Sequence, residues 1–150
     1  MDLYPSTQEM VIRLILAALL GGLLGLEREW RKKPAGLRTH MMVSLGAATF
    51  TLIALDLYSF VAPGEGGRAS VDPIRIVDAV ATGIGFLGAG CIIQGRGSVQ
   101  GLTTAGSLWL AGAIGLSAGG GLYLLAAAAI VIAVVILAVI GRLEARFQGH

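Results

Sequence analysis

The chain has few charged residues. Asp, Glu, Lys and Arg make up 13% of its 150 residues, and hydrophobic residues make up 55%. Charged residues account for about 25% of an ordinary globular domain. In addition, none of the four charged types occurs between Arg96 and Arg142. A soluble domain of this size would not leave so long a stretch uncharged, so the composition excludes that class and predicts a protein with several membrane spans.

Cysteine is also scarce, and the chain lacks a basic N-terminal start. Cys91 is the only cysteine, which excludes an internal disulfide framework. No serine, cysteine and histidine are arranged at membrane depth in a way suited to nucleophilic catalysis, so we expect no enzymatic activity. Asp2 and Glu9 precede the first basic residue, Arg13, whereas a secretory signal peptide begins with basic residues. We therefore expect the first apolar segment to be retained as a membrane span. The net charge of +2 is small, and we expect no nucleic-acid partner.

The apolar segments predict an all-α membrane protein, a bundle of about five transmembrane helices in a single domain that covers residues 1–150. As one helix, residues 97–141 would extend ~68 Å at ~1.5 Å per residue. The hydrocarbon core of a bilayer is only ~30 Å thick, so this stretch should form two spans. The predicted spans are residues 10–26, 37–58, 74–93, 102–116 and 122–140. The last is almost purely aliphatic, and we expect it to face lipid.

The basic residues predict the orientation of the bundle. Eight of the eleven Lys and Arg residues fall on one side, in the first and third connections and after the fifth span. Because basic residues favour the cytoplasmic side, we expect the N-terminus outside and the C-terminus in the cytoplasm. The longest outer loop, residues 59–73, is rich in Gly, Pro and Ser, and we expect it to be irregular.

Small residues recur at helical spacing in three of the spans. They allow the backbones of membrane helices to approach closely. The candidate packing residues are Ala17, Gly21, Gly25, Gly83, Gly85, Gly88, Gly90, Ala111, Gly115 and Gly119. Because the third span carries its glycines on two sides, we expect this helix at the centre of the bundle. Small-residue faces that stay free after folding would serve a homo-oligomer, with a dimer favoured.

A polar group is predicted in the outer half of the membrane. Asp78 and Thr82 share one stripe of the third span, and Arg13 of the first span lies at a similar depth. One interpretation is an Arg13–Asp78 ion pair that orients two helices. Another is a polar cavity where Asp78 and Thr82 bind a cation through their oxygens. Ordinary exposure of Asp78 near the membrane surface is the third.

A second polar group is predicted at the cytoplasmic face. Its candidate residues are Glu27, Arg28, Arg38, Thr39, His40, Thr103 and Thr104. A short turn at residues 34–36 keeps the first two spans adjacent, so that Glu27 can meet Arg38. This predicts either a salt-bridged hairpin, whose basic residues 31–33 favour anionic lipid heads, or a site for a metal or regulatory ligand at Glu27, Arg38 and His40. The two threonines begin the fourth span, where we expect a hydroxyl cap.

Four motifs in this order resemble one known family. They are GLERE at residues 25–29, PAGLRTH at 34–40, GIGFLGAG at 83–90 and GLTTA at 101–105, the last followed by Leu108 and Trp109. Together they resemble the transmembrane domain of the MgtC/SapB family of bacterial inner-membrane proteins. The resemblance covers about residues 13–146.

The resemblance implies a five-span, multi-pass domain in the bacterial inner membrane and a link to magnesium homeostasis. Several family members look like regulators that act on other membrane proteins, including ATP synthase, so we expect a regulatory module that binds a membrane protein. The alternative is a channel or carrier for Mg²⁺ or another small solute. No cofactor is expected other than a possible Mg²⁺. The virulence-type members carry a soluble domain after the fifth span. The sequence stops at His150, so we expect either that the protein lacks that domain or that this chain is a truncated form of it. Those members also have Asn and Cys where Thr103 and Leu110 stand, so their specific role is not carried over.

Overall fold

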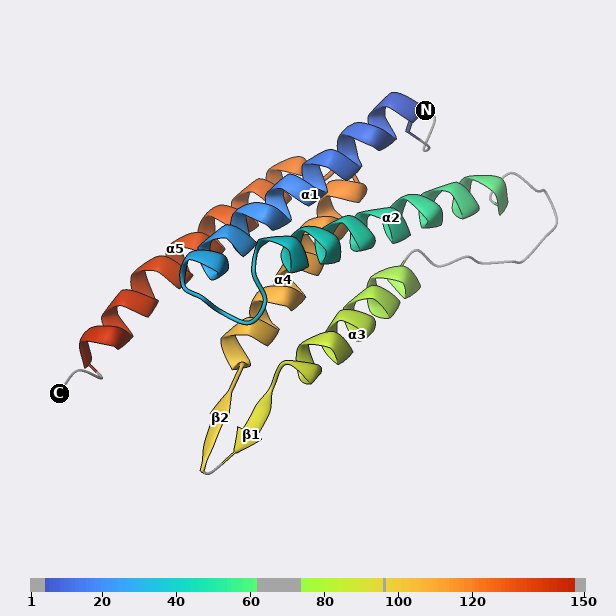
Figure 1. Ribbon diagram of the computed structural model, residues 1–150. Helices are drawn as coiled ribbons and strands as arrows, with labels where there is room; N and C mark the ends of the chain where they lie inside the picture. Colours follow the sequence, from blue (N-terminus) through green and yellow to red (C-terminus); the bar gives the residue numbers. More distant parts are fainter. Residues whose placement is uncertain (1–4, 62–73, 96, 148–150) are drawn as a thin grey trace.

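The computed structural model describes residues 5–61, 74–95 and 97–147, which form five helices and one short β-hairpin (Figure 1). The helices are α1 (Thr7–Trp30), α2 (Leu37–Val61), α3 (Ile74–Gly90), α4 (Leu102–Gly119) and α5 (Tyr123–Phe147). Strands β1 (Ile93–Gly95) and β2 (Ser98–Gln100) pair antiparallel between α3 and α4. The predicted bundle of five helices is confirmed. Residues 62–73 of the predicted outer loop lie outside the described residues.

Local chemistry explains where two of the helices begin. The Ser6 hydroxyl caps α1 by accepting a hydrogen bond from the Glu9 N–H at 3.3 Å. Gly101 precedes α4 with a φ of 88°, and a side chain there would overlap the Cys91 carbonyl. No side chain caps α4, so the predicted hydroxyl cap is wrong. The hairpin delivers the chain to α4 through Gly101, which places Thr103 and Thr104 inside the first turn.

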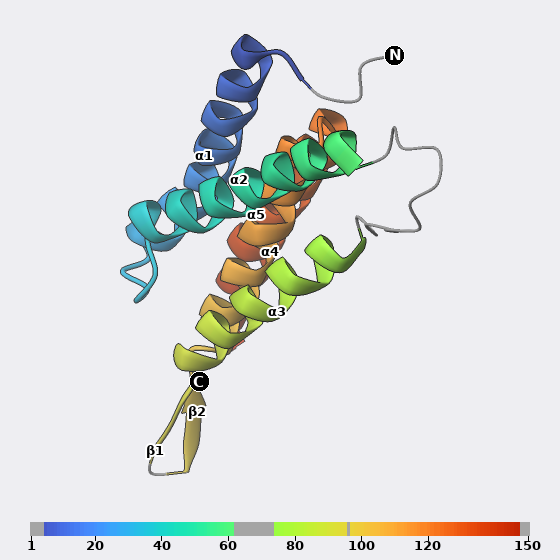
Figure 2. The same ribbon diagram turned by 90° about the vertical axis from the view of Figure 1, so that its right-hand side faces the viewer.

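The centre of the bundle is α4, which packs against all four other helices, whereas α3 packs mainly against α4 and α2. Figures 1 and 2 show α3 at one edge of the molecule. The prediction that the third helix is central is therefore wrong. The reason is that α4 buries small residues all along its length, while a Cβ at Gly83, Gly85 or Gly90 would meet open space. Among the predicted packing glycines of α3, only Gly88 is buried, against Ala105.

The small residues of the first and fourth spans lie where α1, α2 and α4 approach closely. A Cβ at Gly21 would lie 2.5 Å from the Ser44 Cβ, and one at Gly25 would lie 2.8 Å from the Gly36 carbonyl oxygen. A Cβ at Gly115 would overlap the Ser44 carbonyl. These three helices therefore touch through their backbones, as small residues permit.

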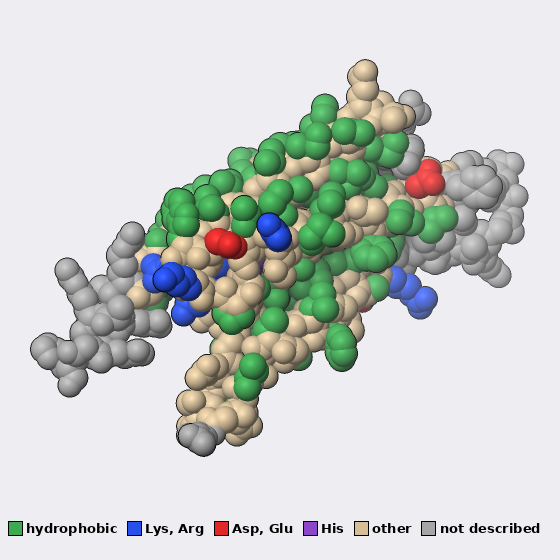
Figure 3. Space-filling view, viewed as in Figure 1, with side chains coloured by type: hydrophobic (Ala, Val, Ile, Leu, Met, Phe, Trp, Pro, Cys, Tyr) green, Lys and Arg blue, Asp and Glu red, His purple; other side chains and the backbone are tan. Residues whose placement is uncertain are grey.

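Three helices among the described residues are long and apolar enough to cross a membrane: Thr7–Trp30, Leu37–Ser59 and Tyr123–Gly141. With 17 and 18 residues, α3 and α4 reach ~26–27 Å at ~1.5 Å per residue. That is slightly less than the ~30 Å hydrocarbon core. Hydrophobic side chains cover the flank of the bundle, and most charged side chains lie toward its two ends (Figure 3). The orientation remains a prediction.

The fifth helix contributes one narrow apolar stripe to the core. Ala126, Ile130 and Ala133 pack against Leu24 and Ile114, and most other side chains between residues 123 and 141 are exposed. This arrangement agrees with the expected lipid-facing role of α5.

Candidate polar site at the junction of α1, α2 and α4

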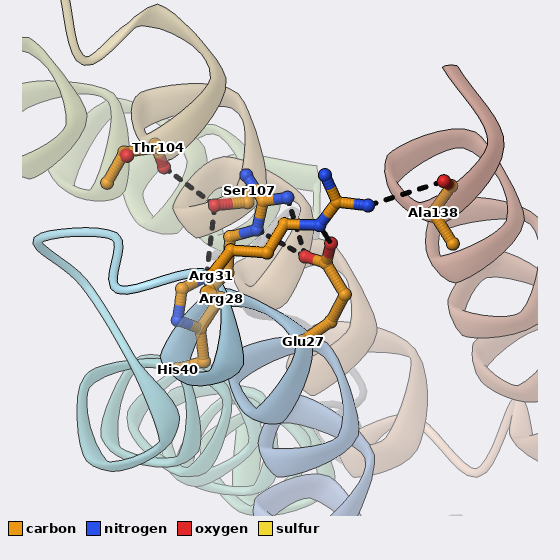
Figure 4. Close-up of polar contacts among 7 residues, drawn as sticks. All are labelled: Glu27, Arg28, Arg31, His40, Thr104, Ser107 and Ala138. Atoms are coloured by element: carbon orange, nitrogen blue, oxygen red, sulfur yellow. Dashed lines mark hydrogen bonds and ion pairs between the residues drawn. The ribbon is translucent and has the colours of Figure 1, made fainter. Parts of the chain in front are cut away.

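Polar side chains gather where α1 ends, α2 begins and α4 begins (Figure 4). We call them the junction cluster, which consists of Glu27, Arg28, Arg31, His40, Thr104 and Ser107. Arg28 is 3% exposed, and His40, Thr104 and Ser107 are also buried. A buried guanidinium is costly unless it is paired and hydrogen-bonded, so the partners of Arg28 decide the character of this site.

The Glu27 carboxylate lies between two guanidinium groups. Its Oε2 accepts a hydrogen bond from Arg28 Nε at 2.6 Å, and its Oε1 lies 2.5 Å from Arg31 Nε. Arg31 also reaches α5, where its Nη2 donates to the Ala138 carbonyl at 3.3 Å. One carboxylate thus faces two cations, which leaves the cluster with an excess of positive charge.

His40 links α2 to α4. Its Nδ1 lies 2.9 Å from the Gly36 carbonyl oxygen, and its Nε2 lies 3.0 Å from Ser107 Oγ, which in turn lies 2.8 Å from the Thr104 carbonyl oxygen. Because a carbonyl only accepts, Nδ1 carries a proton. The single Ser107 proton serves either Nε2 or the Thr104 carbonyl, so a neutral His40 leaves one of these contacts without a proton.

Other predicted members of the cytoplasmic group lie outside the cluster. Arg38, Thr39 and Thr103 are exposed. Glu27 pairs with Arg28 and with Arg31 one turn away, so the predicted contact with Arg38 is not formed. Instead, Glu29 bridges the turn, because its Oε2 accepts from the Leu37 N–H at 2.8 Å at the start of α2.

The predicted polar group of the outer half is not assembled within one chain. Arg13 pairs with Glu9, one turn earlier, and its Nη1 donates to the Gly119 carbonyl at 2.8 Å. A guanidinium at the C-terminal end of α4 is favoured by the carbonyls left unpaired there. Asp78 and Thr82 are exposed on α3. The predicted Arg13–Asp78 ion pair is therefore not formed among the described residues, and neither is the cavity.

Two buried serines, Ser44 and Ser107, were absent from the predicted site. Ser107 follows Thr104 by three residues, and Ser44 follows His40 by four, so each shares a helix face with a predicted residue. Ser44 Oγ donates to the Ala17 carbonyl at 2.7 Å and thereby ties α2 to α1. Their spacing of three and four residues from predicted site residues is the signal that could have predicted both serines.

The donor set of the junction cluster does not fit Mg²⁺. Magnesium prefers several oxygen ligands, usually with one or two carboxylates. The single carboxylate of the cluster, Glu27, is already held by two guanidinium groups. No group of three or more His, Cys, Asp or Glu residues that could hold a metal ion occurs in the described part of the chain. The geometry of the cluster instead joins the helices in two pairs: His40 and Ser107 tie α2 to α4, and Arg31 ties the end of α1 to α5.

Comparison with known proteins identifies the family. The family model described as the MgtC family matches residues 14–146. The chain belongs to the MgtC family.

Relatives within and beyond the enterobacteria agree with this assignment. The proposed magnesium transporter YhiD of Escherichia coli strain K12 is 41% identical over 143 residues, which cover 95% of this chain and 66% of YhiD. The SrpB protein of Synechococcus elongatus is 40% identical over 74% of this chain and 63% of SrpB. The MgtC protein of Brucella abortus strain 2308 is 44% identical over 77% of this chain and 44% of that protein. The chain thus spans between about two fifths and two thirds of these relatives, and no solved structure matches it.

Proposed function

We propose that this chain is a regulatory module of the bacterial inner membrane that contributes to magnesium homeostasis by binding another membrane protein. Membership of the MgtC family and the likeness to YhiD support the link to magnesium. The placement of the polar side chains supports regulation in preference to transport.

The observation that carries this proposal is the one-sided distribution of buried polar groups. Arg28, His40, Thr104 and Ser107 lie in the junction cluster, and Ser44 lies one turn further along α2. Beyond them, the contact of α1, α2 and α4 is filled by Ala17, Ala48 and Ala118, each completely buried. A carrier needs polar groups along a path across the bilayer. The alanine layer supplies none among the described residues.

The exposed residues around the cluster suit a partner better than the cluster itself does. Trp30 is 76% exposed, Lys32 and Lys33 follow it in the turn and are exposed, and Arg38 is exposed in the first turn of α2. A basic surface with an aromatic group attracts an acidic protein surface and is favoured at interfaces. The hydrogen bond from the Leu37 N–H to Glu29 then holds the end of α1 against the start of α2, so that this surface keeps its shape.

A growth assay with charge variants tests the proposed partner surface. A bacterial strain that lacks its own MgtC-family protein is supplied with this chain and grown at limiting Mg²⁺. The charge-removing variant Lys32→Ala, Lys33→Ala, Arg38→Ala should lose growth support although it reaches the membrane normally. The charge-keeping variant Lys32→Arg, Lys33→Arg, Arg38→Lys is the matched control and should retain it. Equal growth of both variants would exclude the basic surface as the partner site.

A channel or carrier for Mg²⁺ or another small solute is the second candidate, and the likeness to YhiD, a proposed magnesium transporter, favours it. Purified wild-type protein in liposomes that contain a magnesium-sensitive dye separates the two functions. The regulatory proposal expects no flux above empty liposomes. Protein-dependent Mg²⁺ flux would establish the carrier and overturn the regulatory proposal.

A further inference from the structure

The outer face of α3 carries a regular seam of exposed residues. Arg75, Asp78, Thr82, Gly85 and Ala89 follow one another at spacings of three, four, three and four, and all five are exposed. Such a spacing, with a mean of 3.5 residues, keeps one face of a helix toward a parallel partner helix. We call these five residues the α3 seam.

The depth of the seam makes its exposure costly. Ile76 and Val80 of α3 line a groove of about 640 Å³ between α3 and α2. Ile76 and Val77 also line a second pocket with Ala54 and Tyr58, near the end of α2. Those α2 residues lie inside the membrane-spanning segment Leu37–Ser59. Asp78 therefore lies at the level of the last turns of that span, where a carboxylate that faces lipid is expensive.

The charges of the seam complement each other across a two-fold axis. The side chains of Arg75 and Asp78 form no hydrogen bond or ion pair with any residue in the described ranges. If two copies of α3 pack in parallel about an axis along the membrane normal, Arg75 of each copy meets Asp78 of the other. A two-fold interface uses the same patch on both subunits, so a patch that carries both signs satisfies itself.

Below the charged pair, the seam has the shape that close packing needs. A Cβ at Gly85 would meet no atom within 4 Å in the isolated chain, and Ala89 follows one turn later. The spacing of Thr82, Gly85 and Ala89 allows two backbones to approach closely. Phe86, which is 80% exposed, borders the seam and would be covered by the partner.

We propose that a second copy of this chain docks on the α3 seam, with two reciprocal Arg75–Asp78 ion pairs between the copies. The groove between α2 and α3 lies on another side of α3, and it stays open to lipid chains in this dimer. The inference does not rest on a role in magnesium homeostasis, because it concerns assembly alone.

Cysteine cross-linking in liposomes tests the position of the interface. The sole cysteine is first removed by Cys91→Ser, and then Thr82→Cys or Ala89→Cys is introduced in the full chain. A disulfide needs Cβ atoms about 3.8 Å apart, so both seam variants should form dimers under mild oxidation. Leu87→Cys, at the same level but on the groove side, is the matched control and should react at least about tenfold more slowly. Faster cross-linking at Leu87, or equal rates at all three positions, would overturn the proposal.

A charge swap tests the ion pairs. Arg75→Asp should weaken dimerisation in the bilayer roughly tenfold, because two carboxylates then face two others. The double variant Arg75→Asp, Asp78→Arg restores opposite charges across the axis and should recover wild-type dimerisation. Helix content and thermal unfolding of the variants show whether the monomer still folds. An Arg75→Asp variant that folds and dimerises as tightly as wild type overturns the proposal, and so does a folded double variant that fails to recover.

Discussion

Both α1 and α3 carry glycines at helical spacing, yet they use them in opposite ways. In α1, Gly21 and Gly25 lie against the backbone and side chains of α2, where a single added carbon would clash. In α3, Gly83 and Gly85 have open space around the position of a Cβ. The comparison teaches that small residues mark a face that can be approached closely. The positions of the neighbouring elements decide whether anything in the same chain approaches it.

The charges of the two helices differ in the same way. Glu27 of α1 holds two guanidinium groups within the junction cluster. Asp78 of α3 has no ion-pair partner among the described residues. An unpaired carboxylate at membrane depth is costly. Asp78 therefore calls for a partner from outside the chain, whereas Glu27 does not.

The largest expected difference concerns these two carboxylates. Glu27→Gln should lower the free energy of unfolding by about 3 kcal/mol, because it leaves the buried Arg28 guanidinium without its charge partner. Asp78→Asn, the matched change on α3, should leave the stability of the monomer within about 0.5 kcal/mol. Denaturant titration in detergent, with the protein monomeric, measures both.

A double variant shows whether the loss comes from the unpaired charge. Glu27→Gln with Arg28→Met removes both partners, and replacing a buried pair by neutral groups of similar volume is often nearly neutral. The double variant should therefore regain most of the stability. Equal losses in Glu27→Gln and Asp78→Asn would contradict the distinction between the two regions.

A smaller difference is expected at the glycines. Gly21→Ala should cost about 1–3 kcal/mol, since the new methyl group overlaps Ser44 and forces α1 and α2 apart. Gly83→Ala adds the same group into open space and should be neutral or stabilising by up to about 1 kcal/mol, because alanine favours the helix. Thermal unfolding of the two variants in the same detergent gives the comparison. A loss of stability in Gly83→Ala that matched Gly21→Ala would mean that α3 is packed more tightly than its surroundings indicate.

The sequence predicted the helices well because each apolar run is bounded by polar or turn residues. It did not predict which helix is central, since α3 and α4 have similar small-residue patterns and only the path of the chain separates them. The hairpin after α3 turns the chain back so that α4 enters between the other helices. The spacing of residues within either helix does not predict where the hairpin places α4.

The site was predicted in part, and helical geometry explains the division. His40 and Thr104 lie on inward faces, whereas Thr39 and Thr103, each one residue away, are rotated outward by about 100°. The Arg13–Asp78 pairing rested on similar depth alone, and depth does not determine which way a side chain points around its helix. Glu9, one turn from Arg13, was the nearer partner in the sequence itself.

The smallest difference compares two serines of α4 that both bond within their own helix. Ser107 Oγ also meets His40 Nε2 at 3.0 Å, whereas Ser117 Oγ donates only to the Ala113 carbonyl at 2.8 Å. Ser107→Ala should cost about 1–2 kcal/mol, because it leaves the buried His40 nitrogen without a partner. Ser117→Ala should cost less than about 0.5 kcal/mol, because the carbonyl it releases is already bonded within the helix. If the two variants unfold at the same denaturant concentration, the His40–Ser107 contact between α2 and α4 contributes nothing to the stability of the protein. The stability of the junction would then rest on the Glu27 ion pairs, the glycine contacts and the hydrogen bonds of Glu29, Arg31 and Ser44.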